Sequence, residues 1–307
     1  MADGSVTEHA ITLRNAIVIS HFGHEVLIRD ESGEDYRAVT RSQLPGLVSG
    51  DRVHWQMTID DTAVIEALVP RHGVLSRSTK NNPDKIVVSN VDKVLIVCAI
   101  KPTFKTGLID RYLVACELSE ITPVIVVNKA DLLSEDKYNK VVNSLAMYEQ
   151  IGYDIYYIST KEHSNITQLR NSLLNFTAVL VGQSGVGKSS IIRALVPNAE
   201  PTIADVSDAT NKGKHTTSNS TLYDIDHTTH IIDSPGIREF GLKPLGADDL
   251  SHGFREFRPF IGQCKFRDCT HHQEPGCAIA QAVKAGKIAQ KRWDSYQAIA
   301  ASFSSAN

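Results

Sequence analysis

Short apolar runs separated by turn residues occupy the first 70 positions of the chain. The runs at 10–20, 24–30, 35–40, 51–58 and 62–69 are rich in Val and Ile, and the stretches between them contain Gly, Pro and Asp. This alternation predicts β-strands joined by turns. Five short strands in about 70 residues predict a small closed barrel, of which the oligonucleotide-binding (OB) barrel is the commonest form. A barrel that serves only for packing is the alternative.

The hydrophobic pattern changes after residue 70. The segment 71–85 has no apolar periodicity and is predicted to be a linker. Between 86 and 241, continuous apolar runs such as VLIVCAI and PVIVVN alternate with amphipathic helical stretches, which is typical of a parallel sheet covered on both faces. The pattern from 242 to 307 is mostly helical. We therefore predict three domains: a barrel (1–70), an α/β domain (86–241) and a helical domain (242–307).

The composition is that of a soluble, multidomain globular protein. The 307 residues are 42% hydrophobic and 22% charged, which excludes global disorder and a fibrous repeat. The run VLIVCAI is far shorter than the roughly 20 residues that a membrane span needs. The first residues lack the basic and apolar regions of a secretory signal. We expect a cytoplasmic protein with no membrane contact.

The charge distribution limits where a nucleic acid could bind. The net charge is −3, so no overall basic signature is present. Residues 1–70 contain five Arg, no Lys and eleven Asp or Glu. A nucleic-acid surface on the barrel would therefore have to be local.

The strongest motif is a glycine-rich loop between a Val-rich strand and a helical run. The sequence GQSGVGKS at 182–189 has the spacing GxxxxGK[ST], in the strand–loop–helix context that gives the spacing meaning. Glycines let successive N–H groups face a phosphate, and the following helix adds its N-terminal partial charge. Lys188 would reach the β- and γ-phosphates, and Ser189 would bind Mg²⁺. The candidate binding residues are Gly182, Gln183, Ser184, Gly185, Val186, Gly187, Lys188, Ser189 and Ser190.

A second motif, NKAD at 128–131, follows another apolar run. The Asp131 carboxylate can accept from both N1–H and the 2-amino group of guanine, a pair that adenine lacks. Asn128 could read the O6/N7 edge or tie its loop to the phosphate loop, and the Lys129 stem could lie along the base. Together with the phosphate loop, this motif favours GTP over ATP. A further loop is expected to support the guanine from its other side, at Ser159, Thr160 and Lys161.

Candidate Mg²⁺ ligands lie downstream of the phosphate loop. Asp233 ends a short apolar strand and would hold Mg²⁺ through water, while the N–H of Gly236 could meet the γ-phosphate. Thr216 or Thr217 would complete the shell. Spacing alone does not choose between them, and we prefer Thr217. The alternative is that these threonines only solvate a loop.

The residue that positions the attacking water is less evident. Ile237 follows Gly236, where Ras-like enzymes place a glutamine, and an aliphatic side chain cannot orient water. His215 is the nearest polar candidate in the sequence. Arg238 is a weaker one, and a contact within the loop or with a nucleic acid is the alternative role for His215.

Three of the five cysteines lie within fourteen residues and suggest a zinc site. The spacing Cys264-x4-Cys269-x-His271-x5-Cys277 offers three thiolates and one imidazole, enough for closed tetrahedral coordination and a structural role. His272 is the alternative fourth ligand, although the Cys-x-His spacing favours His271. Cys98 and Cys116 are expected to be buried thiols. Nearby cations could form a surface that faces a nucleic acid or only a solvated face: Arg255, Arg258, Lys265, Arg267, Lys284, Lys287, Lys291 and Arg292.

The order of the motifs is unusual for a P-loop GTPase. The base-reading motif at 128–131 precedes the phosphate loop at 182–189, so the sequence is circularly permuted. With the barrel, the sequences GKHTTS (213–218) and DSPGIREFGL (233–242) and the Cys/His spacing, the chain resembles the RsgA/YjeQ family of circularly permuted GTPases over nearly its whole length.

The resemblance implies an enzyme that hydrolyses GTP to GDP and phosphate. It implies binding to the small (30S) ribosomal subunit and its 16S rRNA during late maturation, stimulation by the subunit, and release in the GDP state. It also implies one structural Zn²⁺ held by Cys264, Cys269, His271 and Cys277, Mg²⁺ bound with GTP, and a monomer. Two alternatives remain: a GTP-binding rRNA scaffold with negligible catalysis, and a P-loop kinase of a small metabolite.

Overall fold

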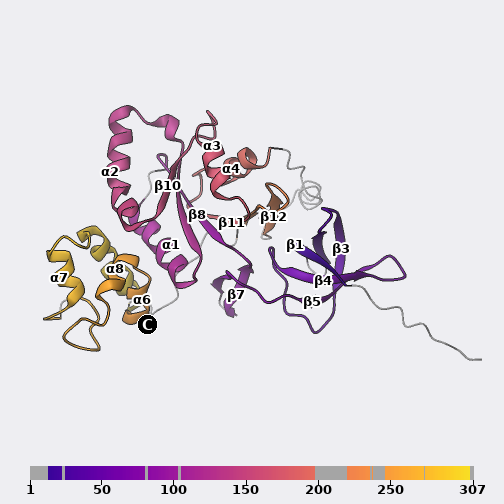
Figure 1. Ribbon diagram of the computed structural model, residues 1–307, viewed down its shortest axis with the longest axis horizontal. Helices are drawn as coiled ribbons and strands as arrows, with labels where there is room; N and C mark the ends of the chain where they lie inside the picture. Colours follow the sequence, from indigo (N-terminus) through magenta and orange to yellow (C-terminus); the bar gives the residue numbers. More distant parts are fainter. Residues whose placement is uncertain are drawn as a thin grey trace, which may run out of the picture.

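The computed structural model describes residues 13–22, 25–79, 82–102, 105–197, 220–235, 237, 246–272 and 274–304. A β-barrel and a helical module lie at opposite ends of a central α/β domain (Figure 1). Within the described segments, no helix combines the length and apolar character that crossing a bilayer requires.

The N-terminal domain is a closed five-stranded barrel, as predicted. Its strand order is β1-β2-β3-β5-β4, with β4 pairing back onto β1 and a parallel pair between β3 and β5. Trp55 is fully buried in the interior among residues such as Val18, Ile28 and Ile65. The strands are β1 (Arg14–Phe22), β2 (Glu25–Asp30), β3 (Asp35–Thr40), β4 (Arg52–Met57) and β5 (Ala63–Leu68).

The segment predicted to be a linker (71–85) instead contains most of a β-hairpin. Strands β6 (Leu75–Thr79) and β7 (Asn82–Val88) pair antiparallel in a two-stranded sheet. Leu75 and Val88 are fully buried and join the core of the central domain. This hairpin is hard to predict from the sequence, because most residues between 76 and 85 are polar.

The central domain is a six-stranded sheet in the order β10-β9-β8-β11-β13-β12, parallel except for β12. Alternate residues of β8 enter two separate cores: Val94 and Ile96 lie on one face, and Leu95 and Val97 on the other. Both faces are therefore covered, as the apolar runs predicted. The strands are β8 (Lys93–Ala99), β9 (Thr122–Asn128), β10 (Asp154–Tyr157), β11 (Thr177–Val181), β12 (Thr221–Asp224) and β13 (His230–Asp233).

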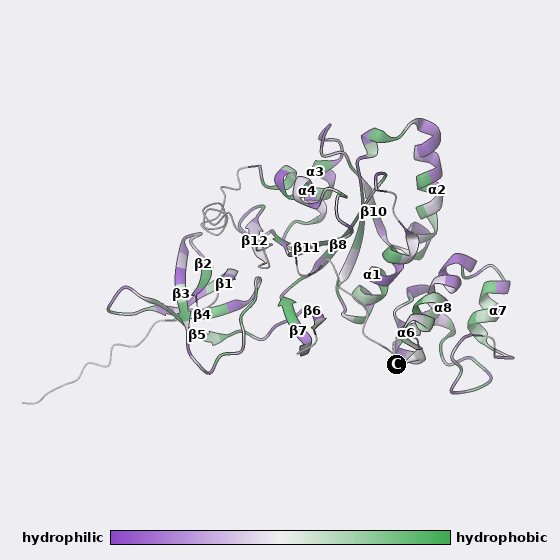
Figure 2. Ribbon diagram, turned by 180° about the vertical axis from the view of Figure 1, so that it is seen from behind, coloured by the Kyte–Doolittle hydropathy of each residue, from purple (hydrophilic) through white to green (hydrophobic). Residues whose placement is uncertain are grey.

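Helices cover the two faces of this sheet in separate pairs. Residues of α1 and α2 pack in one core, and residues of α3 and α4 pack in the other. Along α2, hydrophilic and hydrophobic residues alternate, as expected for a helix with one solvated face (Figure 2). The elements are α1 (Thr106–Leu118), η1 (Ala130–Leu132), α2 (Glu135–Ile151), α3 (Ile166–Ser172) and α4 (Lys188–Leu195).

The C-terminal module is helical and has its own small core. Phe254 and Phe257 are fully buried with ring centroids 4.8 Å apart, and Tyr296 packs against both. The elements are α6 (Ala247–His252), η3 (Arg255–Phe260), α7 (Ala278–Lys284) and α8 (Gln290–Ser304). The barrel, the permuted α/β domain and this mostly helical module together match the predicted architecture.

Buried charge joins the helical module to α1. Arg292 of α8 is fully buried and pairs with Asp110 of α1 and, at 2.6 Å, with Glu256. Arg255 and Arg258 both pair with Glu117, at the end of α1. Arg292 is therefore excluded from the surface that was predicted to face a nucleic acid, because its side chain is fully buried, whereas Arg255 and Arg258 pair with Glu117 and stay partly exposed.

Replacing Arg292 by Ala is expected to lower the free energy of unfolding by about 3–5 kcal/mol, since it leaves two carboxylates buried without their cation. Chemical denaturation followed by tryptophan fluorescence would measure the change. Lys291→Ala is the matched control: its side chain is exposed, so its effect should stay within about 0.5 kcal/mol. Equal stability of the two variants would contradict this role of Arg292.

Several polar contacts join the barrel to the rest of the chain, among them those of Asp51 and Arg29. Asp51 is fully buried and accepts from Arg71 Nε at 2.7 Å and from the Ser89 hydroxyl. Arg29 of β2 pairs with Asp224 of β12. The barrel thus contacts the strand that hydrogen-bonds with β13, the strand ending at Asp233.

Candidate functional site

The predicted nucleotide motifs meet at one edge of the central sheet. Asn128 ends β9, Ser159 lies two residues beyond β10, Gly182 follows β11, and Asp233 ends β13. Because these strands are parallel, their carboxyl ends lie at the same edge, which is where open α/β sheets bind ligands. The permuted order of the motifs in the chain does not separate them in space.

The phosphate loop requires glycine at two close approaches. At Gly182 (φ +140°), a Cβ would lie 2.2 Å from the Val97 carbonyl oxygen of β8. At Gly187 (φ +98°), a Cβ would lie 2.3 Å from Nδ2 of Asn128. Any side chain at these positions would push the loop away from the sheet, so the motif glycines have a local structural cause.

Lys188 begins α4 and turns back over the phosphate loop. Its Nζ donates to the carbonyl oxygens of Gly182 at 2.8 Å and Gln183 at 2.9 Å. The ammonium group therefore lies over the loop whose backbone would surround a phosphate. Phosphate oxygens would offer it charge-assisted hydrogen bonds, which are stronger than bonds to neutral carbonyls.

Asn128 ties the base-reading loop to the phosphate loop. It is fully buried, its Nδ2 donates to the Val186 carbonyl at 3.0 Å, and its Oδ1 accepts from the Lys129 N–H at 2.8 Å. Of the two roles left open by the sequence, these contacts correspond to the tie between loops.

Lys129 and Asp131 are both held by partners at this edge. Lys129 Nζ donates to the carbonyl oxygens of Lys101 and Gly185, each at 2.7 Å. Asp131 Oδ1 accepts from the Ser159 hydroxyl at 2.6 Å. A carboxylate accepts several hydrogen bonds, so the contact with Ser159 orients Asp131 and leaves it capacity to accept from a base. The contact from Lys101 was not anticipated, because it is made by a backbone carbonyl and has no side-chain signal.

Several predicted residues fall outside the described segments. These are His215, Thr216, Thr217, Gly236 and Arg238. Asp233 lies at the end of β13, opposite Thr221 of β12. Ile237 is 1% exposed and belongs to the core that contains α1 and α2. The side chain that replaces the expected glutamine therefore packs in the interior.

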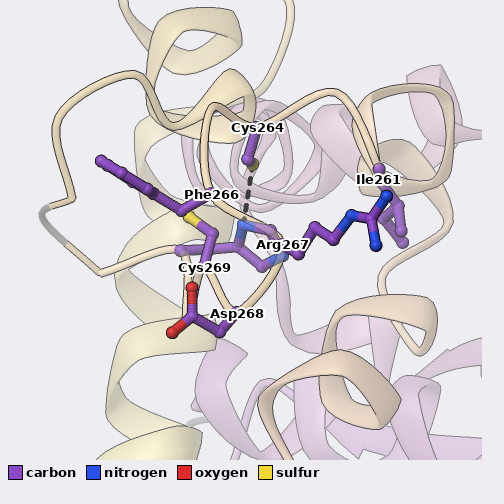
Figure 3. Close-up of a pocket in the computed structure, with 8 residues that line it drawn as sticks. Ile261, Cys264, Phe266, Arg267, Asp268 and Cys269 are labelled. Carbon is purple, nitrogen blue, oxygen red and sulfur yellow. Dashed lines mark hydrogen bonds between the residues drawn. The ribbon is translucent and has the colours of Figure 1, made fainter.

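Cys264, Cys269, His271 and Cys277 form a cluster in the helical module, in the region drawn in Figure 3. One candidate ligand atom from each residue lies within 4.8 Å of the others. His271 Nδ1 is 3.5 Å from Cys264 Sγ and 3.7 Å from Cys277 Sγ. Tetrahedral Zn²⁺ with its usual bond lengths separates sulfur and nitrogen ligands by about 3.5 Å. The donor set and its spacing fit a zinc ion, and the exposed His272 is not in the cluster.

The cluster is supported by hydrogen bonds from its surroundings. The N–H groups of Ala278 and Ala280 point to Cys264 Sγ and Cys277 Sγ, each at 3.4 Å. Trp293 Nε1 donates to the His271 carbonyl at 3.1 Å. Donors of this kind hold ligands in the orientation a metal needs. Trp293 was not predicted, and its spacing from the cysteines in the sequence gives no sign of the contact.

Glu274 holds the turn that carries His271. Its carboxylate accepts from the backbone N–H groups of Thr270 at 2.8 Å and His272 at 2.9 Å. Desolvation opposes ionisation of this group, but hydrogen bonds from Thr270 and the backbone prevail and lower its pKa to about 2. Glu274 is therefore a carboxylate at neutral pH that fixes the turn from outside the cluster.

The remaining two cysteines lie in the central domain. Cys98 and Cys116 are both buried, and burial raises the pKa of the Cys98 thiol to about 12. None of the five cysteines, all within described segments, forms a disulfide. The two central thiols match the expected inert role.

Comparison with known proteins agrees with this arrangement. The sequence model for "RsgA GTPase" matches residues 68–243. The small ribosomal subunit biogenesis GTPase RsgA of Haemophilus influenzae (strain 86-028NP) is 42% identical over 295 residues, covering 95% of this chain and 85% of that protein. Its counterpart in Chromohalobacter salexigens is 45% identical over 286 residues, covering 92% and 84%.

Two solved structures share the fold. YjeQ from Thermotoga maritima matches with a TM-score of 0.78 and 31% identity, covering 95% of this chain and 99% of that one. YloQ, described as a circularly permuted GTPase, matches with a TM-score of 0.76 and 26% identity, covering 98% of both chains. The permuted order of motifs is thus shared with a known structure.

Proposed function

The chain belongs to the RsgA GTPase family, and from that premise we propose that it is a GTP-hydrolysing factor in biogenesis of the small ribosomal subunit. The main support for the proposal is a hydrogen bond from the Asn128 side chain to the Val186 carbonyl. This bond joins the NKAD loop (128–131), the candidate guanine-binding loop, to the phosphate loop (182–189) at one edge of the sheet. The relatives from Haemophilus influenzae and Chromohalobacter salexigens are both named small ribosomal subunit biogenesis GTPases, and their similarity extends over nearly the whole chain.

The proposed cycle couples nucleotide state to subunit binding. The GTP-bound protein binds the small (30S) subunit and contacts its 16S rRNA. The subunit stimulates hydrolysis to GDP and phosphate, and the GDP-bound protein leaves. We propose that the protein acts as a monomer in the cytoplasm, whose reducing conditions suit five cysteines without a disulfide.

Each nucleotide motif has a proposed role. Asp131 accepts from guanine, Lys129 lies along the base, and Thr160 and Lys161 belong to the supporting loop behind Ser159. Lys188 neutralises charge that develops on the phosphates. Magnesium, when bound with GTP, would stabilise the same charge. Its proposed ligands are Ser189, Asp233 and either Thr217 or Thr216, with the N–H of Gly236 near the γ-phosphate.

The metal cluster has a proposed structural role. Four protein ligands close a tetrahedral site and leave no position for substrate. Zinc is the proposed ion because three thiolates and one imidazole are a common structural zinc set.

We propose that His215 positions the attacking water once the subunit orders its loop. Ile237 cannot do so, because it is aliphatic and buried. His215→Ala should lower subunit-stimulated turnover by about 10²-fold or more while leaving the affinity for GTP unchanged. The exposed His227, in the turn after β12, is the control: His227→Ala should retain stimulation. Normal stimulated turnover by His215→Ala would exclude His215.

A GTP-binding rRNA scaffold with negligible catalysis is the second candidate. The buried Ile237 favours it, since the position after Gly236 has no side chain that can orient water. The family membership argues against it, because the family is one of GTPases.

The deciding measurement is GTP hydrolysis with and without purified small ribosomal subunits. ATP in place of GTP, and large subunits in place of small ones, are the controls. We expect acceleration only with GTP and small subunits. Tight GTP binding with turnover that no ribosomal particle accelerates would refute the proposed cycle and support the scaffold.

A further inference from the structure

The loop between the first two cysteines of the cluster has fixed ends. Cys264 and Cys269 both belong to the cluster, and the Lys265 N–H donates to the Gly276 carbonyl at 3.1 Å. Gly276 has φ +82°, and a Cβ there would lie 2.8 Å from Cβ of Lys265. Residues 265–268 therefore form a loop that is closed at both ends and packs against Gly276, the residue before Cys277.

This loop exposes an aromatic ring. Phe266 is 43% exposed, whereas Phe254 and Phe257 in the same module are fully buried. Phe266 and Arg267 extend in opposite directions from the loop (Figure 3). The exposed part of the phenyl ring presents a flat apolar face to solvent, on which another planar group can stack.

One cation lies beside the ring, and others are exposed elsewhere in the same module. Lys265 Nζ lies 5.4 Å from the centroid of the Phe266 ring. Further exposed cations of the module make no ion pair with any described residue: Arg267, Lys284, Lys287 and Lys291. Among the described residues of the module, the exposed carboxylates are fewer: Asp249, Asp268 and Asp294. Charge complementarity therefore favours a polyanionic partner over an acidic or neutral one.

We propose that Phe266 is a stacking platform for an unpaired base of single-stranded RNA, with Lys265 contacting an adjoining phosphate. Every base presents a flat face that can stack on an aromatic side chain, and a nearby cation pairs with the backbone. A paired base in a duplex has both faces covered, so the platform selects unpaired nucleotides. This inference rests on the RNA contact in the proposed function and names the residue and the form of RNA.

The test measures binding of the full-length protein to fluorescent RNA. An unstructured ten-nucleotide RNA and a duplex of the same length are titrated against wild type, Phe266→Ala and Phe266→Tyr. We expect Phe266→Ala to weaken single-strand binding about tenfold, with little change for the duplex, and Tyr to preserve it. The chain offers a matched control in Phe176, which is 39% exposed with Lys93 Nζ 4.2 Å from its ring centroid. Phe176→Ala should bind RNA normally.

Several results would overturn the stacking role. These are normal single-strand binding by Phe266→Ala, equal weakening for single strand and duplex, or no single-strand binding by wild type. Weaker binding to small subunits with unchanged binding to naked RNA would assign the ring to a ribosomal protein instead. Metal content and thermal unfolding of each variant confirm that it is folded. Subunit-stimulated GTP hydrolysis by wild type, measured in parallel, tests the proposed function separately.

Discussion

Asp131→Asn is expected to weaken GTP binding by about 10³-fold or more and to make xanthosine triphosphate the preferred nucleotide. Sites built to hydrogen-bond a substrate reject an analogue whose pattern does not match by large factors, because buried polar groups are left unpaired. The amide of Asn would place an N–H donor against the 2-amino group of guanine. Xanthine carries a carbonyl oxygen at that position, which accepts from the amide.

The local structure makes this substitution a clean one. The Ser159 hydroxyl, which donates to Asp131 at 2.6 Å, can also donate to an amide oxygen, although the bond is weaker without the charge. The backbone at 128–131 is held by Asn128 and Lys129, and neither is altered. The effect should therefore fall on the base and spare the phosphates.

Titration with fluorescent GTP and xanthosine triphosphate would measure the two affinities. Asp136→Asn is the matched control, because Asp136 is an exposed carboxylate in the first turn of α2. It should bind GTP as wild type does. If Asp131→Asn kept its preference for GTP, Asp131 would not be the guanine acceptor.

Much of the fold could be predicted because buried positions are occupied by apolar residues, and their spacing is visible in the sequence. Both faces of β8 are covered, so Val94, Leu95, Ile96 and Val97 are all apolar and read as one continuous run. The barrel strands were equally visible, because turns punctuate them. The hairpin β6–β7 was missed, since residues 76–85 are almost all polar and only its ends, Leu75 and Val88, join the core.

Charged residues were the least predictable part. Arg292 was expected at the surface because arginine usually is, yet its partner Asp110 lies 182 residues earlier in the chain. Arg29 and Asp224 are separated by 195 residues. Such pairs depend on how domains pack, and nothing local in the sequence encodes the partner.

The candidate site was predictable where chemistry fixes the spacing. The phosphate loop and the Cys/His cluster are local motifs, so their residues come together over short stretches of chain. For Asn128 the sequence left two roles open, reading the base edge or tying its loop to the phosphate loop. It could not choose between them, because Asn128 and its partner Val186 are 58 residues apart. The supports of the cluster, such as Trp293, could not be foreseen, since they act through backbone atoms of their partners.

Cys277→Ala is expected to abolish metal binding and to unfold much of the helical module. Structural zinc contributes on the order of 10–16 kcal/mol in small zinc-dependent peptides, so its loss removes a major stabilising term. Cys277 is 2% exposed, and its sulfur also accepts from the Ala280 N–H at the start of α7. The substitution therefore removes one metal ligand and one helix cap together. The nucleotide motifs lie in the central domain, so basal GTP hydrolysis should persist.

Cys116→Ala is the matched control, because Cys116 is a fully buried cysteine of α1 outside the cluster. Elemental analysis should find one zinc per chain in wild type and in Cys116→Ala, and none in Cys277→Ala. Thermal unfolding should show an early transition only in Cys277→Ala, since only this variant loses the ion that joins four separate positions of the module. One zinc per chain in Cys277→Ala, or none in wild type, would contradict the assignment.

The same experiment also separates the stabilising effect of the metal from that of docking on α1, because Arg292 and the ion pairs with Glu117 connect the module to α1. Folding of the module without zinc would mean that docking on α1, and not the metal, stabilises it.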